Sequence, residues 1–258
     1  MPAPTPAKRT SEIFNRLNGI GIEDIDAAER CLFQLRALGG MNKLDFSGRV
    51  AWAQAALIAG YRDQALEQMH AAYYIRDMTD WPAFDALMRV HMHAGLWGRA
   101  LELSRALANT PGMSANELVM TNCALVALGA GDVAFLQELA KIQQSSKNFA
   151  GGFLKQLEEL EMLEHFGAHQ RIVNEIVKDV QIHRSIGFCP DDDGCMVIID
   201  QIYVDGTRTT RQSIRDRLYD ALEADFAPLV PERFDYDLRV MPLVSVAPRH
   251  SGVSGVAA

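Results

Sequence analysis

The sequence predicts a mainly α-helical protein in which stacked helical hairpins are followed by a small α+β part. Glycines end apolar, helix-like stretches at Gly60, Gly95, Gly131 and Gly167, with gaps of 35, 36 and 36 residues. A fixed period in this range is typical of stacked supersecondary units. After residue 180 the pattern changes to short β-rich runs around a polar turn, followed by one more helical stretch.

Each of the four glycines is preceded by one helix-like run and followed by another. The first runs cover 49–60, 81–95, 115–131 and 152–167, and the second runs cover 61–76, 96–109, 132–144 and 168–180. Glycine adopts the left-handed turn that ends a helix at little cost, so it belongs between the two helices of a hairpin. Residues 10–40 contain a short helix, a glycine turn and a longer helix, and they predict one more hairpin that caps the stack.

Equivalent positions of the four units share residue types in part. The fifth residues after the glycines are Ala65, Ala100, Leu136 and Ile172. Small residues at such places let crossing helices approach closely, so we expect Ala65 and Ala100 to be buried. The eighth residues before the glycines are Trp52, Leu87, Cys123 and Glu159, so the last unit departs from the apolar pattern.

Together, the period, the glycine before the second helix and the small residue within it resemble the tetratricopeptide repeat (TPR). The resemblance covers about Asp45 to Val180 and is degenerate, because the family's tyrosines and closing prolines are mostly missing. An irregular helical bundle is the alternative. The resemblance implies a curved helical array, here residues 11–180, that binds a peptide or partner helix in its groove.

Residues 181–245 predict a β-β-α-β module. Its strands are expected near 182–189, 195–204 and 234–242, and Ile214, Leu218 and Leu222 form the helical stripe that covers the sheet. Because two or three strands are not stable alone, the module either docks on the helical domain or completes its sheet with another chain, as a homo-oligomer. Residues 1–10 and 246–258 are small and polar, and are predicted to be a flexible arm and tail.

Composition narrows the class of protein. Hydrophobic residues make up 48% and charged residues 22%, as in ordinary globular proteins. No stretch approaches the roughly 18 apolar residues of a membrane span, and the formal charge of −8 makes a membrane or nucleic-acid partner an unfavoured interpretation. No secretory signal opens the sequence, and Cys31 and Cys123 lie among apolar helical residues, so a reducing cytoplasm is the expected compartment.

No residue pattern indicates a catalytic site, a metal or a cofactor. Asp191, Asp192 and Asp193 precede Gly194 as in a hairpin turn, without the alternating ligands of a calcium loop. Cys189 and Cys195 flank this turn. Reduced thiols are favoured there, and a disulfide or half of a zinc site with His183 is the alternative.

Histidines offer no better metal site. His91 and His93 are two residues apart on a predicted helix and point to different faces, while His70 lies in another helix. We therefore predict helix-surface or groove-lining histidines.

Aromatic residues concentrate in the first two hairpins. Tyr73 and Tyr74 are adjacent on a predicted helix, so they cannot both point inward. Exposed aromatic and arginine side chains are typical anchors for a bound segment. We therefore expect Tyr73 or Tyr74, with Arg89 and His93 from the next hairpin, to line a partner-binding groove.

Arginines gather at the start of the C-terminal helix. Arg208, Arg211 and Arg215 form a candidate anion-binding site, because Arg211 and Arg215 share one face and a helix N-terminus attracts anions. A solvated face paired with neighbouring acidic residues is the favoured interpretation.

These observations predict a non-enzymatic interaction scaffold, with adaptor, assembly-factor and chaperone-like roles left open. The first alternative is a nucleic-acid-associated regulator that uses the arginine-bearing helix. The second is an enzyme with a site between the two modules, built from His183, Asp200 and Asp205.

Overall fold

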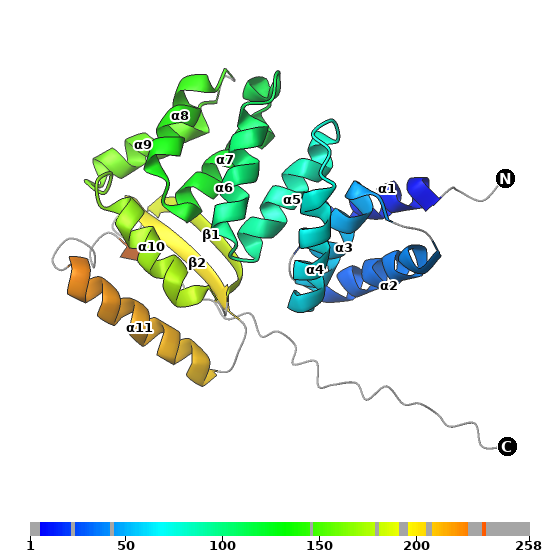
Figure 1. Ribbon diagram of the computed structural model, residues 1–258. Helices are drawn as coiled ribbons and strands as arrows, with labels where there is room; N and C mark the ends of the chain where they lie inside the picture. The colour runs from blue at the N-terminus through cyan, green and yellow to red at the C-terminus, as the bar shows by residue number, and fades with distance from the viewer. Residues whose placement is uncertain are drawn as a thin grey trace.

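The computed structural model is a helical array with a short sheet against one side (Figure 1). It describes residues 6–21, 24–41, 44–144, 147–178, 181–190, 196–204, 208–226 and 234–235. Within this described part, no helix is both long enough and apolar enough to cross a membrane.

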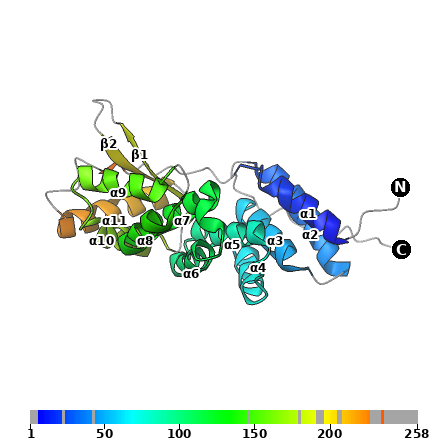
Figure 2. The same cartoon turned by 90° about the horizontal axis from the view of Figure 1, so that it is seen from above.

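Within the described residues, ten helices precede the sheet and pack as successive hairpins. They are α1 (Pro6–Leu17), α2 (Ile25–Met41), α3 (Phe46–Ile58), α4 (Arg62–Tyr74), α5 (Trp81–His93), α6 (Trp97–Ala108), α7 (Glu117–Ala130), α8 (Val133–Ile142), α9 (Phe149–Glu159) and α10 (Phe166–Val177). A 3₁₀ turn, Met113–Ala115, precedes α7. Each helix from α3 to α8 contacts the next along the chain, and α3, α5, α7 and α9 also contact one another in sequence. The first helices of the hairpins therefore form a continuous layer in an elongated row (Figure 2).

Three of the four predicted glycine turns are confirmed. Gly60, Gly95 and Gly131 have φ values of 81°, 77° and 70°, and each lies between the two helices of a hairpin. The fourth prediction is wrong, since Gly167 lies inside α10. The chain turns instead between α9 and α10, where Glu161 has the positive φ of 57°.

Gly167 has a packing role in place of a turning role. A Cβ at this position would lie 2.8 Å from the carbonyl oxygen of Gly131, closer than real Cβ contacts. Because neither residue has a side chain, the start of α10 approaches the end of α7 at backbone distance. Gly167 therefore keeps the 36-residue spacing from Gly131, but it serves the packing of α10 on the end of α7 instead of a turn.

The first helices are capped at the same period. Asp45, Asp80 and Asn116 precede α3, α5 and α7, and each side chain accepts a hydrogen bond from the backbone N–H three residues later. Such a cap satisfies one of the free N–H groups of the first turn and contributes about 1 kcal/mol. Ala65 and Ala100, both predicted at helix crossings, are fully buried.

The C-terminal part contains a strand pair, a helix and a two-residue strand. β1 (Gln181–Pro190) pairs antiparallel with β2 (Met196–Val204), and β3 (Phe234–Asp235) pairs parallel with β2. The predicted third strand extended to 242, and its remainder lies outside the described residues. The helix α11 (Arg208–Phe226) has its main contacts with α10, whereas the sequence predicted that it would cover the sheet.

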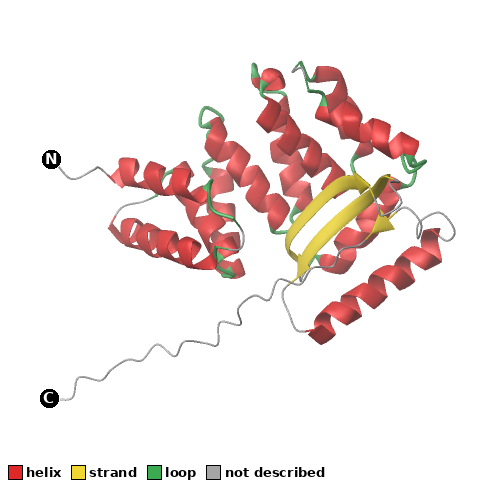
Figure 3. Cartoon of the chain, turned by 180° about the vertical axis from the view of Figure 1, so that it is seen from behind, coloured by secondary structure: helices red, strands yellow, loops and turns green. Residues whose placement is uncertain are grey.

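The strand pair packs on the array, as Figure 3 shows from behind. β1 contacts α5 and α7. Ile186, Ile198 and Ile202 of the strands belong to the same apolar core as the helices, as do Ile214 and Leu218 of α11. The core therefore continues from the hairpins into the C-terminal elements.

Candidate functional site

A cavity of about 240 Å³ lies where α5, the start of α6, α7 and β1 meet. Arg89, Met92 and His93 line it from α5, and Leu125 and Ile186 line it from α7 and β1. We call this region the inner wall. Arg89 and His93, which the sequence singled out for a groove, lie one turn apart and do meet here.

Asp85, one turn before Arg89 on α5, forms an ion pair with it beneath the inner wall. The Arg89 Nε donates to Asp85 Oδ2 at 3.0 Å, and Asn122 Nδ2 donates to both Asp85 oxygens at 2.9 and 3.1 Å. Burial raises the pKa of Asp85, while Arg89 and the Asn122 amide lower it. Arg89 is therefore oriented from below and keeps part of its guanidinium at the surface.

Arg184 of β1 is the buried centre of a polar network behind the cavity. Its Nε donates to Asp200 Oδ1 at 2.8 Å, and its Nη2 donates to Asp200 Oδ2 and to Gln170. Its Nη1 donates to Asn174 and, at 3.4 Å, to the carbonyl of Gly129. All five guanidinium N–H groups therefore have acceptors, which is the condition for burying this charge.

The network also fixes the state of a neighbouring histidine. His169 is fully buried on α10, and its Nδ1 lies 3.3 Å from Gln170 Nε2. Burial, assisted by the positive charge of Arg184, lowers the pKa of His169 to about 3. His169 is consequently neutral near pH 7 and is a core residue.

The tyrosine pair separates between core and solvent, as adjacent helical positions require. Tyr73 is 9% exposed and lies between two arginines, whose Cζ atoms are 4.2 Å (Arg76) and 4.5 Å (Arg99) from the ring centroid. Its hydroxyl donates to Glu102 and accepts from Arg99. Tyr74 is 69% exposed and meets His70 edge to face. Neither tyrosine is among the residues that line the inner-wall cavity.

The predicted anion site is described only in part. The Arg208 side chain lies outside the described side chains, Arg211 is half-buried, and Arg215 is exposed with its Cζ 5.6 Å from the Tyr219 ring centroid. Nearby, Gln212 donates to Asp216 at 2.8 Å.

Candidate metal and catalytic residues are mostly outside the described part. This holds for the side chains of His183, Cys189, Asp205 and residues 191–195. Asp200 is described, and its pairing with Arg184 at zero side-chain exposure leaves it no access to a substrate. The described residues contain no group of three His, Cys, Asp or Glu side chains placed to hold a metal ion.

Comparisons with protein-family models, curated proteins and solved structures gave no match for this chain.

The sequence did not predict the Arg184 network. Of the residues that line the inner-wall cavity, it predicted Arg89 and His93 of α5 but none of those from α7 or β1. A signal for the network was present, because Arg184 shares a strand face with Ile186, and Asp200 shares one with Ile198 and Ile202. Opposite charges at core-facing positions of neighbouring strands indicate a buried pair.

Proposed function

We propose that the protein is a non-enzymatic interaction scaffold of TPR-like architecture that binds a peptide or partner helix along its inner wall. The observation that carries this proposal is the continuous layer of first helices with an open cavity on it. Arg89 and His93 border that cavity, and its apolar wall comes from three further elements. A concave, mostly apolar site with a few fixed polar groups is the usual form of a binding site.

Adaptor and chaperone-like assembly roles both follow from such a surface. The free, buried thiols of Cys31 and Cys123 are consistent with the proposed cytoplasmic location. The buried Arg184 network favours a β1–β2 pair that stays docked beside the cavity and forms one of its walls.

Affinity isolation of the tagged full chain from its native cells tests the proposal. We expect one stoichiometric protein partner that is lost with Leu125→Arg, which places a charge in the cavity, and retained with Ile142→Arg. Ile142 ends α8 and is exposed, so it is the matched control. Circular dichroism checks that both variants are folded.

Two outcomes would redirect the assignment. A partner that both variants retain would remove the inner wall as the binding surface. Recovery of nucleic acid that decreases steeply with salt and with Arg211→Gln/Arg215→Gln would support the regulator alternative.

A further inference from the structure

The hairpin of α1 and α2 lies at one end of the array. Its outer side does not pack against the other described helices. The main contacts of α1 and α2 within the described residues are with α3 and with each other. Figures 1 and 2 place both helices at the end of the row. The terminal unit of a stacked helical array needs a polar outer face if nothing covers it.

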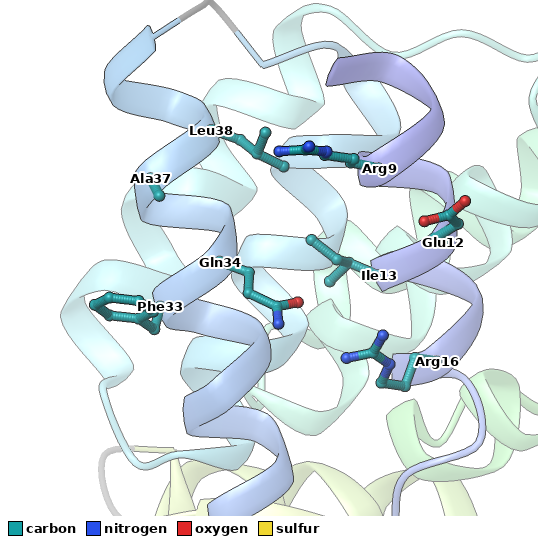
Figure 4. A pocket seen from close by; sticks show the side chains of 8 residues that line it. All are labelled: Arg9, Glu12, Ile13, Arg16, Phe33, Gln34, Ala37 and Leu38. Atoms are coloured by element: carbon teal, nitrogen blue, oxygen red, sulfur yellow. The ribbon is translucent and has the colours of Figure 1, made fainter. Parts of the chain in front are cut away.

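This outer side instead carries a groove between α1 and α2. The pocket has a volume of about 390 Å³, and the buried side chains of Ile13 and Leu38 form its floor. Arg9, Ile13 and Arg16 follow one another along α1 at intervals of four and three residues, so they form one stripe of the helix. We call this pocket the terminal groove (Figure 4).

Phe33 adds a large apolar surface to the rim. Its side chain is 75% exposed and is one of the residues that line the pocket. Fully burying a phenylalanine contributes about 1.5–3 kcal/mol. Because Phe33 is exposed to water in this chain, a partner that covered it would gain this energy on binding.

The charge of the terminal groove opposes that of the whole chain. Arg9 and Arg16 extend across the groove toward α2 (Figure 4), and they outnumber Glu12, which is the third charged residue of the lining. The groove is therefore positive in a protein of formal charge −8. Complementary charge selects an acidic partner and accelerates its association.

The spacing of the two arginines defines the pattern on that partner. Residues seven apart are two helical turns apart, about 10.5 Å along the axis. We propose that the terminal groove binds an amphipathic helix of another protein, with two acidic residues seven positions apart and apolar residues between them. The acidic residues pair with Arg9 and Arg16, and the apolar residues cover Ile13, Leu38 and Phe33. This surface is separate from the inner wall and does not depend on the function proposed there.

The chain's own terminal segments do not carry this pattern. Residues 1–5 contain no acidic residue, and residues 236–258 contain one, Asp237. Neither segment therefore supplies a pair of acidic residues at the required spacing.

The test is selection from a displayed library of amphipathic helices whose flanking positions vary between acidic, neutral and basic residues, using the full chain as bait. We expect enrichment of helices with Asp or Glu seven residues apart. Binding of the enriched peptide should weaken at least about tenfold with Arg9→Glu/Arg16→Glu and with Phe33→Ala, and it should weaken as salt increases.

The matched control is Lys141→Glu/Arg217→Glu, which makes the same change in net charge at exposed positions of α8 and α11. Affinity should be retained there, and also in the inner-wall variant Leu125→Arg. Enrichment without the acidic spacing, or binding that the terminal-groove variants leave unchanged, would overturn the proposal. A dimer in sedimentation that Phe33→Ala dissociates would also overturn it, since a second copy would then occupy the groove.

Discussion

Side-chain surroundings, rather than residue type, separate Tyr73 from Tyr74. The sequence required the two rings to face different sides, but it could not say which ring was inside, because that depends on where α6 packs. Arg76 and Arg99 lie over Tyr73, and Glu102 accepts its hydroxyl, so Tyr73 joins α4 to α6. The prediction that one of these tyrosines borders the same groove as Arg89 and His93 stays untested by binding, although the lining of that cavity contains neither.

Truncating each tyrosine should therefore have different effects. Tyr73→Ala should lower the free energy of unfolding by about 2–4 kcal/mol, because it leaves a cavity and removes one of the hydrogen-bond donors to Glu102. Tyr74→Ala should change it by less than about 0.5 kcal/mol, as for other exposed positions. Urea unfolding of both variants measures this. Equal losses would mean that Tyr74 is also packed.

Neutral, buried His169 makes stability depend on pH. Its folded-state pKa of about 3 lies below the unfolded value of about 6.5, so its contribution is complete above pH 6.5 and is lost as pH falls toward 3. Between pH 7.5 and pH 5.0 this loss should be about 2 kcal/mol. Burial also lowers the pKa of His91, which acts in the same direction.

The variant His169→Asn isolates this effect. Urea unfolding at the two pH values should show a decrease in stability that is smaller by about 2 kcal/mol in the variant than in the parent chain. An unchanged pH dependence would show that His169 is accessible to protons in the folded state.

At the scale of elements, hairpins were predictable because each ends in a local signal. Glycine with positive φ ends α3, α5 and α7, and an Asp or Asn cap starts each of them. The error at Gly167 arose because spacing alone cannot distinguish a glycine that turns the chain from one that lets two helices touch. The placement of α11 against α10 was equally inaccessible, since an apolar stripe does not specify what covers it.

Gly129 and Gly152 provide a matched test of close packing. A Cβ at Gly129 of α7 would overlap the Trp97 ring, whereas a Cβ at Gly152 of α9 would meet nothing within 4 Å. Gly129→Ala should destabilise the protein by about 1–3 kcal/mol through overpacking. Gly152→Ala should be neutral or stabilise by up to about 1 kcal/mol through helix propensity. Chemical unfolding compares them, and a neutral Gly129→Ala would place Trp97 elsewhere.

On the scale of the whole molecule, the Arg184 network joins the strand pair to α7 and α10. Composition and periodicity predicted that the C-terminal part needs a partner surface, but they left open whether that surface belongs to this chain. The answer depends on polar contacts between residues 129 and 200, which no local pattern encodes. The boundary predicted between residues 180 and 181 is crossed by the continuous apolar core.

Breaking this network from one side should be costly. Arg184→Met leaves the Asp200 carboxylate buried without its partner and should lower stability by about 3–5 kcal/mol. Arg184→Met/Asp200→Leu removes both charges and should recover most of that loss. The remainder comes from Gln170 and Asn174, which lose a donor. If the double variant is no more stable than Arg184→Met by urea unfolding, the charge pair does not dominate the network.

The same network sets an order of events during synthesis on the ribosome. The hairpins from α1 to α6 pack mainly on their neighbours along the chain, so they can begin to become compact while the chain is still growing. Asn174 and Gln170 emerge later, and the guanidinium that satisfies them comes from residue 184, with its counter-charge at residue 200. A nascent chain that has reached α10 therefore holds an unfinished polar surface. It is completed only when the residues up to Asp200 have left the exit tunnel.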